Sequence, residues 1–120
     1  MKTLELKLKK DVLIVDIPID AKNIYLSGDS VVFNTNKSCF IKPINDDYEF
    51  FCKGSELTEE IASELVEEHY MNGIRSYEIY NDYRYNDSRW LDNAQDAVIS
   101  AAESKDESID INKCLIFVKK

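Results

Sequence analysis

The side chains that could do chemistry in this chain are one histidine, three cysteines and several pairs of carboxylates. A zinc site needs closely spaced Cys and His ligands, as in C-x-x-C or H-x-x-x-H. Here the cysteines stand at positions 39, 52 and 114, and His69 has no such neighbour. We therefore expect no metal site, no cofactor and no catalytic residues. We expect His69 to be structural, a packed imidazole in the last turn of a helix.

Three glutamates at helical spacing form the first candidate binding site. Glu60, Glu64 and Glu68 are four residues apart, so a helix would carry them along one face. Such a row could bind a cation, could supply an acid and a base in a cleft, or could simply be a solvated helix face. No enzyme motif accompanies the row. The sequence therefore leaves an acidic docking face and a solvated face as the two interpretations.

The second candidate site is the segment 76–90, which holds four of the seven tyrosines, the only tryptophan and two of the three arginines. These residue types dominate binding hot spots, because each combines a large contact area with a polar tip. Nucleobase stacking would use the same side chains, but the interleaved carboxylates would repel phosphates. Packing onto the core and a protein-binding surface remain the open alternatives. The candidate residues are Tyr77, Tyr80, Tyr83, Arg84, Tyr85, Arg89 and Trp90.

The first half of the chain has the patterns of β-strands. Apolar and charged residues alternate in 4–8, and 12–17 is a β-branched run that ends at a proline. The Ser-Gly-Asp-Ser sequence at 27–30 predicts a tight turn between two short strands. The strands expected here are 4–8, 12–17, 24–26, 31–33, 40–41 and 48–52.

The second half has the patterns of helices. Thr58 can cap a helix that Asn72-Gly73 would end, and a second helix should run from about residue 90 or 92 to 104. The run 115–118 predicts a closing strand. The sequence therefore predicts a single α+β domain over 1–120. It would have a small antiparallel sheet from the N-terminal half, two helices packed on one face, and the C-terminal strand joining the sheet.

Charge is distributed unevenly along the chain. Residues 1–53 have a net charge of 0, whereas residues 54–112 carry 15 carboxylates against four basic residues, a net of −11. An acidic half favours partners with a basic surface and disfavours direct nucleic-acid binding. The sequence shows no signal peptide or membrane span, and the three cysteines lie in apolar stretches. We therefore expect buried, reduced thiols, no membrane association and a cytoplasmic location.

Several segments together resemble a family of small uncharacterised proteins from bacteria of the Bacteroides–Flavobacterium group and their phages. The resemblance covers roughly residues 10 to 120, and Lys105-Asp106-Glu107-Ser108 stands where family members often have a glycine. No activity is implied, so no catalytic residue is carried over. What it implies is a context, a phage or mobile-element accessory protein in the host cytoplasm. The segments that carry the resemblance are 48–54, 57–62, 65–67, 97–104 and 112–120.

Three hypotheses about function follow. The first is a non-catalytic acidic protein-binding module, in its sharpest form an accessory protein that inhibits or modulates a host nucleic-acid-handling or defence protein. The second is a virion or assembly component acting as a homo-oligomer through an open sheet edge. The third is a small enzyme of unrecognised type. The first is preferred because of the acidic second half.

Overall fold

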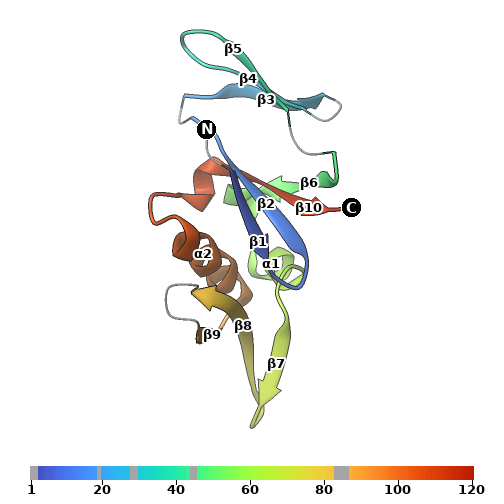
Figure 1. The fold of residues 1–120 in the computed structure, drawn as a ribbon, viewed down its shortest axis with the longest axis vertical. Helices are drawn as coiled ribbons and strands as arrows, with labels where there is room; N and C mark the ends of the chain where they lie inside the picture. Colours follow the sequence, from blue (N-terminus) through green and yellow to red (C-terminus); the bar gives the residue numbers. More distant parts are fainter. Residues whose placement is uncertain (1–2, 19, 28–29, 44–45, 83–86) are drawn as a thin grey trace.

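The computed structural model describes residues 3–18, 20–27, 30–43, 46–82 and 87–120. Over these residues the chain forms ten strands, two α-helices and two 3₁₀ turns, so the predicted α+β class is confirmed. The molecule is elongated, with extents of 53 × 26 × 22 Å. The strands divide into three antiparallel sheets stacked along the long axis (Figure 1).

The central sheet has four strands in the order β1-β2-β10-β6. The C-terminal strand lies between β2 and β6, which confirms that it joins the sheet. Its sequence explains this central place, because an uninterrupted apolar run suits a strand that is covered on both faces. The strands are β1 (Thr3–Lys7), β2 (Asp11–Asp16), β6 (Tyr48–Lys53) and β10 (Cys114–Lys119).

Alternate residues of β2 and β10 enter two different hydrophobic cores. Leu13 and Phe117 point to one face of the central sheet and Ile14 and Ile116 point to the other, and all four side chains are buried. Strand periodicity alone sends neighbours to opposite faces. The central sheet is therefore the wall that the two cores share.

A separate three-stranded sheet covers the first core. It consists of β3 (Lys22–Ser27), β4 (Ser30–Asn34) and β5 (Cys39–Pro43), in that order. Val31 and Phe33 of β4 pack against the central sheet. The prediction of one N-terminal sheet was wrong, because the turn after Pro18 carries the chain from the plane of the central sheet into a second layer.

The helix predicted from Thr58 to Gly73 was also wrong. Thr58 does cap a helix, but α1 ends at Ser63 after five residues. Asn72-Gly73 does not terminate a helix. Both residues have positive φ, 55° and 78°, the geometry of a two-residue hairpin turn. The third sheet follows, with strands β7 (Glu68–Met71), β8 (Ile74–Asp82) and β9 (Asp87–Leu91) in the order β7-β8-β9.

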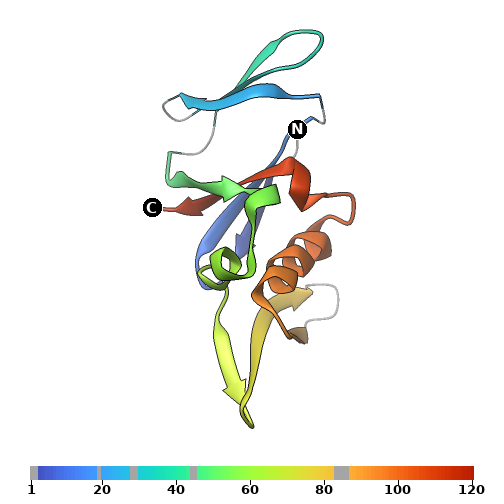
Figure 2. The ribbon, with the colours of Figure 1, turned by 180° about the vertical axis from the view of Figure 1, so that it is seen from behind.

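The second predicted helix is confirmed as α2, residues Ala94–Lys105. It lies next to α1 and packs on β8 and β1, where both helices contribute to the second core (Figures 1 and 2). Small side chains permit this close approach. The buried residues of α2 are Ala94, Ala97, Val98, Ala101, Ala102 and Ser104.

The N-terminus of α2 is held by its own N-cap residue and by one residue that is distant in sequence. The Glu59 carboxylate accepts hydrogen bonds from the backbone N–H groups of Ala94 (2.7 Å) and Gln95 (3.0 Å). The side chain of Asn93 accepts a third, from Asp96 N–H. The first N–H groups of a helix have no partner within the helix, so these acceptors satisfy donors that would otherwise need water. Glu59 thereby joins α1 to α2.

Replacing Glu59 with alanine should destabilise the fold by about 1 kcal/mol, because two helix-end donors lose a charged acceptor. The free energy of unfolding in urea measures the effect. Glu60→Ala is the matched control, since Glu60 is exposed on the same helix and should change stability by less than about 0.5 kcal/mol. Equal effects of the two substitutions would contradict the capping role of Glu59.

Gly54 should tolerate no side chain. It begins the 3₁₀ turn η1 (Gly54–Glu56), which packs against the second turn, η2 (Ile111–Lys113), and a methyl group there would overlap the backbone carbonyl of Ile111. Gly54→Ala should cost about 3 kcal/mol. Gly73→Ala meets open space and only the strain of its positive φ, so about 1 kcal/mol is expected. Urea unfolding of both variants decides, and a smaller loss at Gly54 than at Gly73 would contradict this packing.

Candidate functional site

The candidate site lies on the β7–β9 sheet, on the face turned away from α2. Residues at alternate positions of β8 share a face, so Tyr77 and Ile79 enter the core while Ile74 and Glu78 point the other way. The strand register places His69 opposite Ser76, and Trp90 opposite Glu78. We call the surface formed by His69, Ile74, Glu78 and Trp90 the outer face.

On the outer face, His69 contacts both Trp90 and Glu78. The His69 and Trp90 rings meet edge to face, with centroids 5.1 Å apart. His69 Nε2 lies 3.6 Å from a carboxylate oxygen of Glu78. This nitrogen is buried and has no hydrogen-bond partner among the described residues. With these contacts in place, the exposed fraction of Trp90 is still 48%.

His69 was expected in the last turn of a helix, and this position is wrong. It lies on the strand β7, because the helix stops at Ser63. In the described structure its environment is a mostly buried carboxylate and an indole ring. The contacts that this pair makes in the described structure pack the imidazole against Trp90 and beside the Glu78 carboxylate.

At the tip of the β7–β8 hairpin, polar contacts hold an exposed aromatic ring. Arg75 donates hydrogen bonds to the Tyr70 hydroxyl from Nε (3.2 Å) and Nη2 (2.9 Å), and its guanidinium lies 5.6 Å from the centre of the Tyr70 ring. Arg75 also pairs with Glu68. The hydrogen bond to Tyr70, and then the charge of Glu68, raise the pKa of Arg75. The Tyr70 ring is thereby positioned while 65% exposed.

The acidic row predicted from the sequence is not one helix face. Glu60 is on α1, Glu64 is the residue that ends α1, and Glu68 is on β7 and paired with Arg75. The i, i+4 spacing loses its meaning because the helix stops at Ser63. All three glutamates are exposed.

The tyrosine-rich segment is divided between core, surface and residues outside the described ones. Tyr77 is 1% exposed and belongs to the core, whereas Trp90 is exposed. Tyr80 and Arg89 lie on β8 and β9, where only the backbone is described. Tyr83, Arg84 and Tyr85 are outside the described residues.

Sequence reasoning missed Tyr70, Ile74 and Arg75, which are exposed and surround the hairpin turn. The sequence did contain a pattern that predicts this hairpin. Asn72-Gly73 stands between β-branched and aromatic residues, and an Asn-Gly dipeptide in that setting is the strongest short pattern for a hairpin. The predicted helix assigned that dipeptide to a helix end instead.

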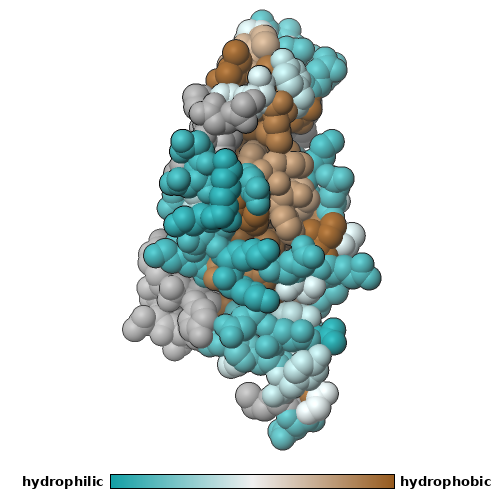
Figure 3. Space-filling view, turned by 90° about the vertical axis from the view of Figure 1, so that its right-hand side faces the viewer, coloured by the Kyte–Doolittle hydropathy of each residue, from teal (hydrophilic) through white to brown (hydrophobic). Residues whose placement is uncertain are grey.

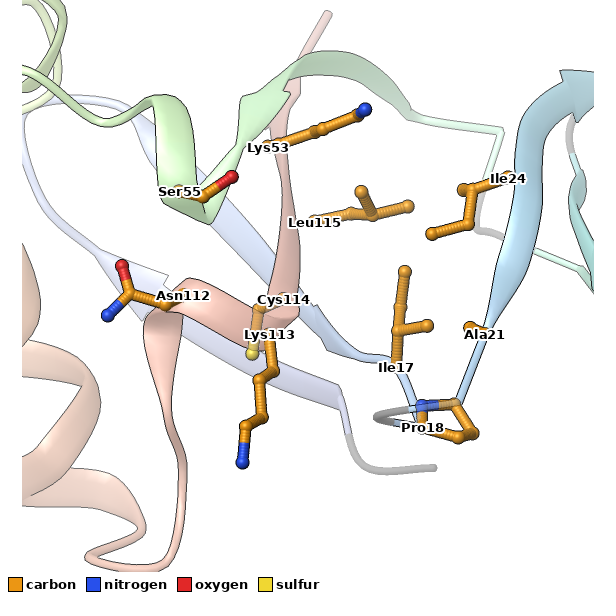
Figure 4. A pocket seen from close by; sticks show the side chains of 10 residues that line it. All are labelled: Ile17, Pro18, Ala21, Ile24, Lys53, Ser55, Asn112, Lys113, Cys114 and Leu115. Atoms are coloured by element: carbon orange, nitrogen blue, oxygen red, sulfur yellow. The ribbon is translucent and has the colours of Figure 1, made fainter. Parts of the chain in front are cut away.

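A recess lies between the central sheet and the β3–β5 sheet (Figure 4). It has a volume of about 230 Å³, with an apolar floor that includes Ile17, Ile24 and Leu115. Ser55 and Asn112 supply polar groups on one side. Lys53 and Lys113 project away from each other, so they do not converge on one ligand atom. Among the described residues that line the recess, no carboxylate is paired with a base.

Two of the three cysteines are buried as expected, but Cys39 is exposed at the edge of the β3–β5 sheet. Burial, and then the charge of Glu56, raise the pKa of Cys52 to about 11. Burial, followed by the charges of Asp16 and Asp110, raises the pKa of Cys114 to about 12. Neither buried thiol is suited to act as a nucleophile at neutral pH.

The described residues contain no group of three or more His, Cys, Asp or Glu side chains placed to hold a metal ion. None of their helices is long and apolar enough to cross a membrane.

Comparison of the chain with protein-family models, with curated proteins and with solved structures found no match. The resemblance to small Bacteroides–Flavobacterium and phage proteins therefore stays a prediction.

Thiol labelling should distinguish the three cysteines. With iodoacetamide at about pH 8, the folded protein should take up label at Cys39 only, because the thiolate is the reactive form and the raised pKa suppresses it at the other two. Peptide mass spectrometry locates the label. Cys39→Ser should leave the folded protein unlabelled, and unfolding in urea should expose the remaining thiols. Label on Cys52 or Cys114 of the folded protein would contradict their burial.

Proposed function

We propose that the protein is a non-catalytic protein-binding module that docks through the outer face and the hairpin tip of the β7–β9 sheet. The observation that carries the proposal is the exposure of three large side chains there. Trp90 is 48% exposed on β9, and Tyr70 and Ile74 are each 65% exposed on the β7–β8 hairpin. This hairpin projects from one end of the molecule (Figure 1). Exposed aromatic side chains on a rigid support are the usual anchors of protein interfaces.

Preorganisation supports this role. His69 and Glu78 fix one side of the Trp90 ring, and Arg75 fixes the Tyr70 ring through its hydroxyl. Side chains that are already ordered lose less conformational entropy when a partner covers them.

The charge near this end of the molecule indicates the kind of partner. Glu60 and Glu64 are exposed on α1 and at its end, beside the start of β7, and the segment 54–112 has a net charge of −11. A partner with a basic surface and an apolar cleft would complement both properties. An inhibitor or modulator of a host nucleic-acid-handling protein is one specific form of this proposal.

The test is affinity capture from lysate of the cell in which the protein is made, with the tagged full chain and two double variants. Trp90→Ala with Ile74→Ser should lower the recovery of a specific partner at least tenfold, the loss expected when two interface anchors are truncated. Leu26→Ser with Phe50→Ser is the matched control, because these residues are exposed and apolar but lie on other sheets.

The outcomes separate the proposal from non-specific adhesion. Loss of partner recovery with Trp90→Ala/Ile74→Ser but not with Leu26→Ser/Phe50→Ser supports docking through the outer face and the hairpin tip. Equal recovery in both variants, or equal loss in both, would contradict it. Raising the salt from about 0.05 M to about 0.5 M should weaken capture further, because exposed charges are screened.

A further inference from the structure

We infer that two copies of this chain associate by pairing their β5 strands antiparallel, about a two-fold axis at Phe40. The inference concerns the β3–β5 sheet, at the opposite end of the molecule from the outer face (Figure 1). It does not depend on the proposed function. The partner is a second copy of the chain, and the bond between copies is a strand-to-strand hydrogen-bond ladder.

The backbone of β5 defines which groups are available at the sheet edge. Thr35 N–H donates to Ser38 C=O (2.8 Å), so Thr35 and Ser38 form a hydrogen-bonded pair at the turn between β4 and β5. Bonded and non-bonded pairs alternate along an antiparallel ladder. Cys39 pairs with Asn34 and Ile41 pairs with Val32, at the non-bonded positions. The N–H and C=O groups of Cys39 and Ile41 therefore point away from β4, toward the open edge.

Pro43 determines the register of the proposed pair. It stands opposite Ser30, at the next non-bonded position, where a backbone N–H would point to the open edge. Proline has no N–H, so this position offers the edge no donor. The usable edge is thus confined to Cys39 and Ile41. Two copies centred on Phe40 place Cys39 opposite Ile41 in both halves, which gives four hydrogen bonds and leaves Pro43 outside the ladder. Centring on Ile41 would place Pro43, which has no backbone N–H, at a position where a donor is needed.

The other described sheet edges carry features that oppose pairing. On the same sheet, β3 has a register irregularity and a positive φ of 54° at Asn23. In the central sheet, β1 exposes Glu5 and Lys7, and β6 pairs with β10 through a register shift. In the third sheet, β7 has four residues and β9 pairs irregularly. Bulges, short strands and charges are the usual protections of edges, and β5 pairs with β4 without a shift.

The side chains of β5 are apolar and accessible. Ile41 is 68% exposed, Phe40 is 43% exposed, and Cys39 is exposed as well. Phe40 stacks on Phe33 with centroids 5.5 Å apart, so a Phe40 ring from the second copy would extend an existing aromatic layer. Figure 3 shows apolar surface running from this sheet toward the central sheet, between hydrophilic regions.

Charge opposes association less at this end of the molecule than at the acidic end. Residues 22–43 contain three lysines and one aspartate, whereas the acidic segment 54–112 forms the other end. In the proposed register Lys42 stands opposite Ser38, so no two lysines are directly opposed. A dimer formed through β5 keeps the two acidic halves far apart and limits their repulsion.

Sedimentation velocity of the full chain, at concentrations from about 1 to 200 µM, tests the association. A concentration-dependent dimer is expected, and Ile41→Pro and Ile41→Lys should each raise its dissociation constant at least tenfold. The proline removes an N–H that points away from β4, so the fold should remain, as thermal melts would verify. Tyr25→Ser is the control, because Tyr25 is exposed on the opposite edge strand and should leave the dimer intact.

Disulfide trapping tests the register. With Cys39→Ser, the variant Phe40→Cys should form a covalent dimer under mild oxidation, since directly opposed non-bonded residues have Cα atoms about 4.5 Å apart. Ile41→Cys in the same background should not, because its two copies would be offset by two residues along each strand. A monomer at every concentration, dimerisation unaffected by Ile41→Lys, or trapping at position 41 instead of 40 would each overturn the inference.

Discussion

The rest of the structure depends on the burial of β10 on both of its faces. Cys114, Leu115, Ile116, Phe117 and Val118 are all 5% exposed or less. A strand with no hydrophilic face cannot lie at the surface, so one layer must cover each side of the central sheet. The helices cover one side and the β3–β5 sheet covers the other. The two-core arrangement is the direct result of a strand in which apolar residues do not alternate with polar ones.

This constraint also explains why most of the large accessible apolar groups are at the ends of the molecule. Elements near the middle of the molecule's long axis cover β10. The edge of β5 and the β7–β8 hairpin extend beyond the central sheet, toward the two ends of the molecule (Figures 1 and 2). If β5 pairs with a second copy, the two outer faces would lie at the distal ends of the dimer. Such a molecule could hold two sites on one partner, with a gain in avidity that requires no further contact.

Much of the fold could be predicted from local patterns, but the pairing of strands could not. Alternation and β-branched runs identified the N-terminal strands, and the spacing of alanines and Val98 identified α2. The spacing of Leu65, Val66 and Tyr70 fits a helix, and Asn72-Gly73 fits both a helix end and a hairpin. The segment forms a hairpin and not a helix because β8 pairs with β7 and β9 and because Tyr77 is buried. Both depend on residues distant in sequence. For the same reason the site was located only in part: Trp90 was predicted, whereas Tyr70 and Ile74 depend on the hairpin turn.

The central claim is that β10 joins both cores into one cooperative unit. Native-state hydrogen exchange, measured residue by residue by NMR, tests it most directly. The account predicts that the amides of Ile116 in β10, Phe33 in β4 and Val98 in α2 exchange with one common free energy, equal to that of global unfolding. Exchange at Phe33 with a distinctly lower free energy, while Ile116 and Val98 stay protected, would show that the β3–β5 sheet opens independently and would contradict the claim.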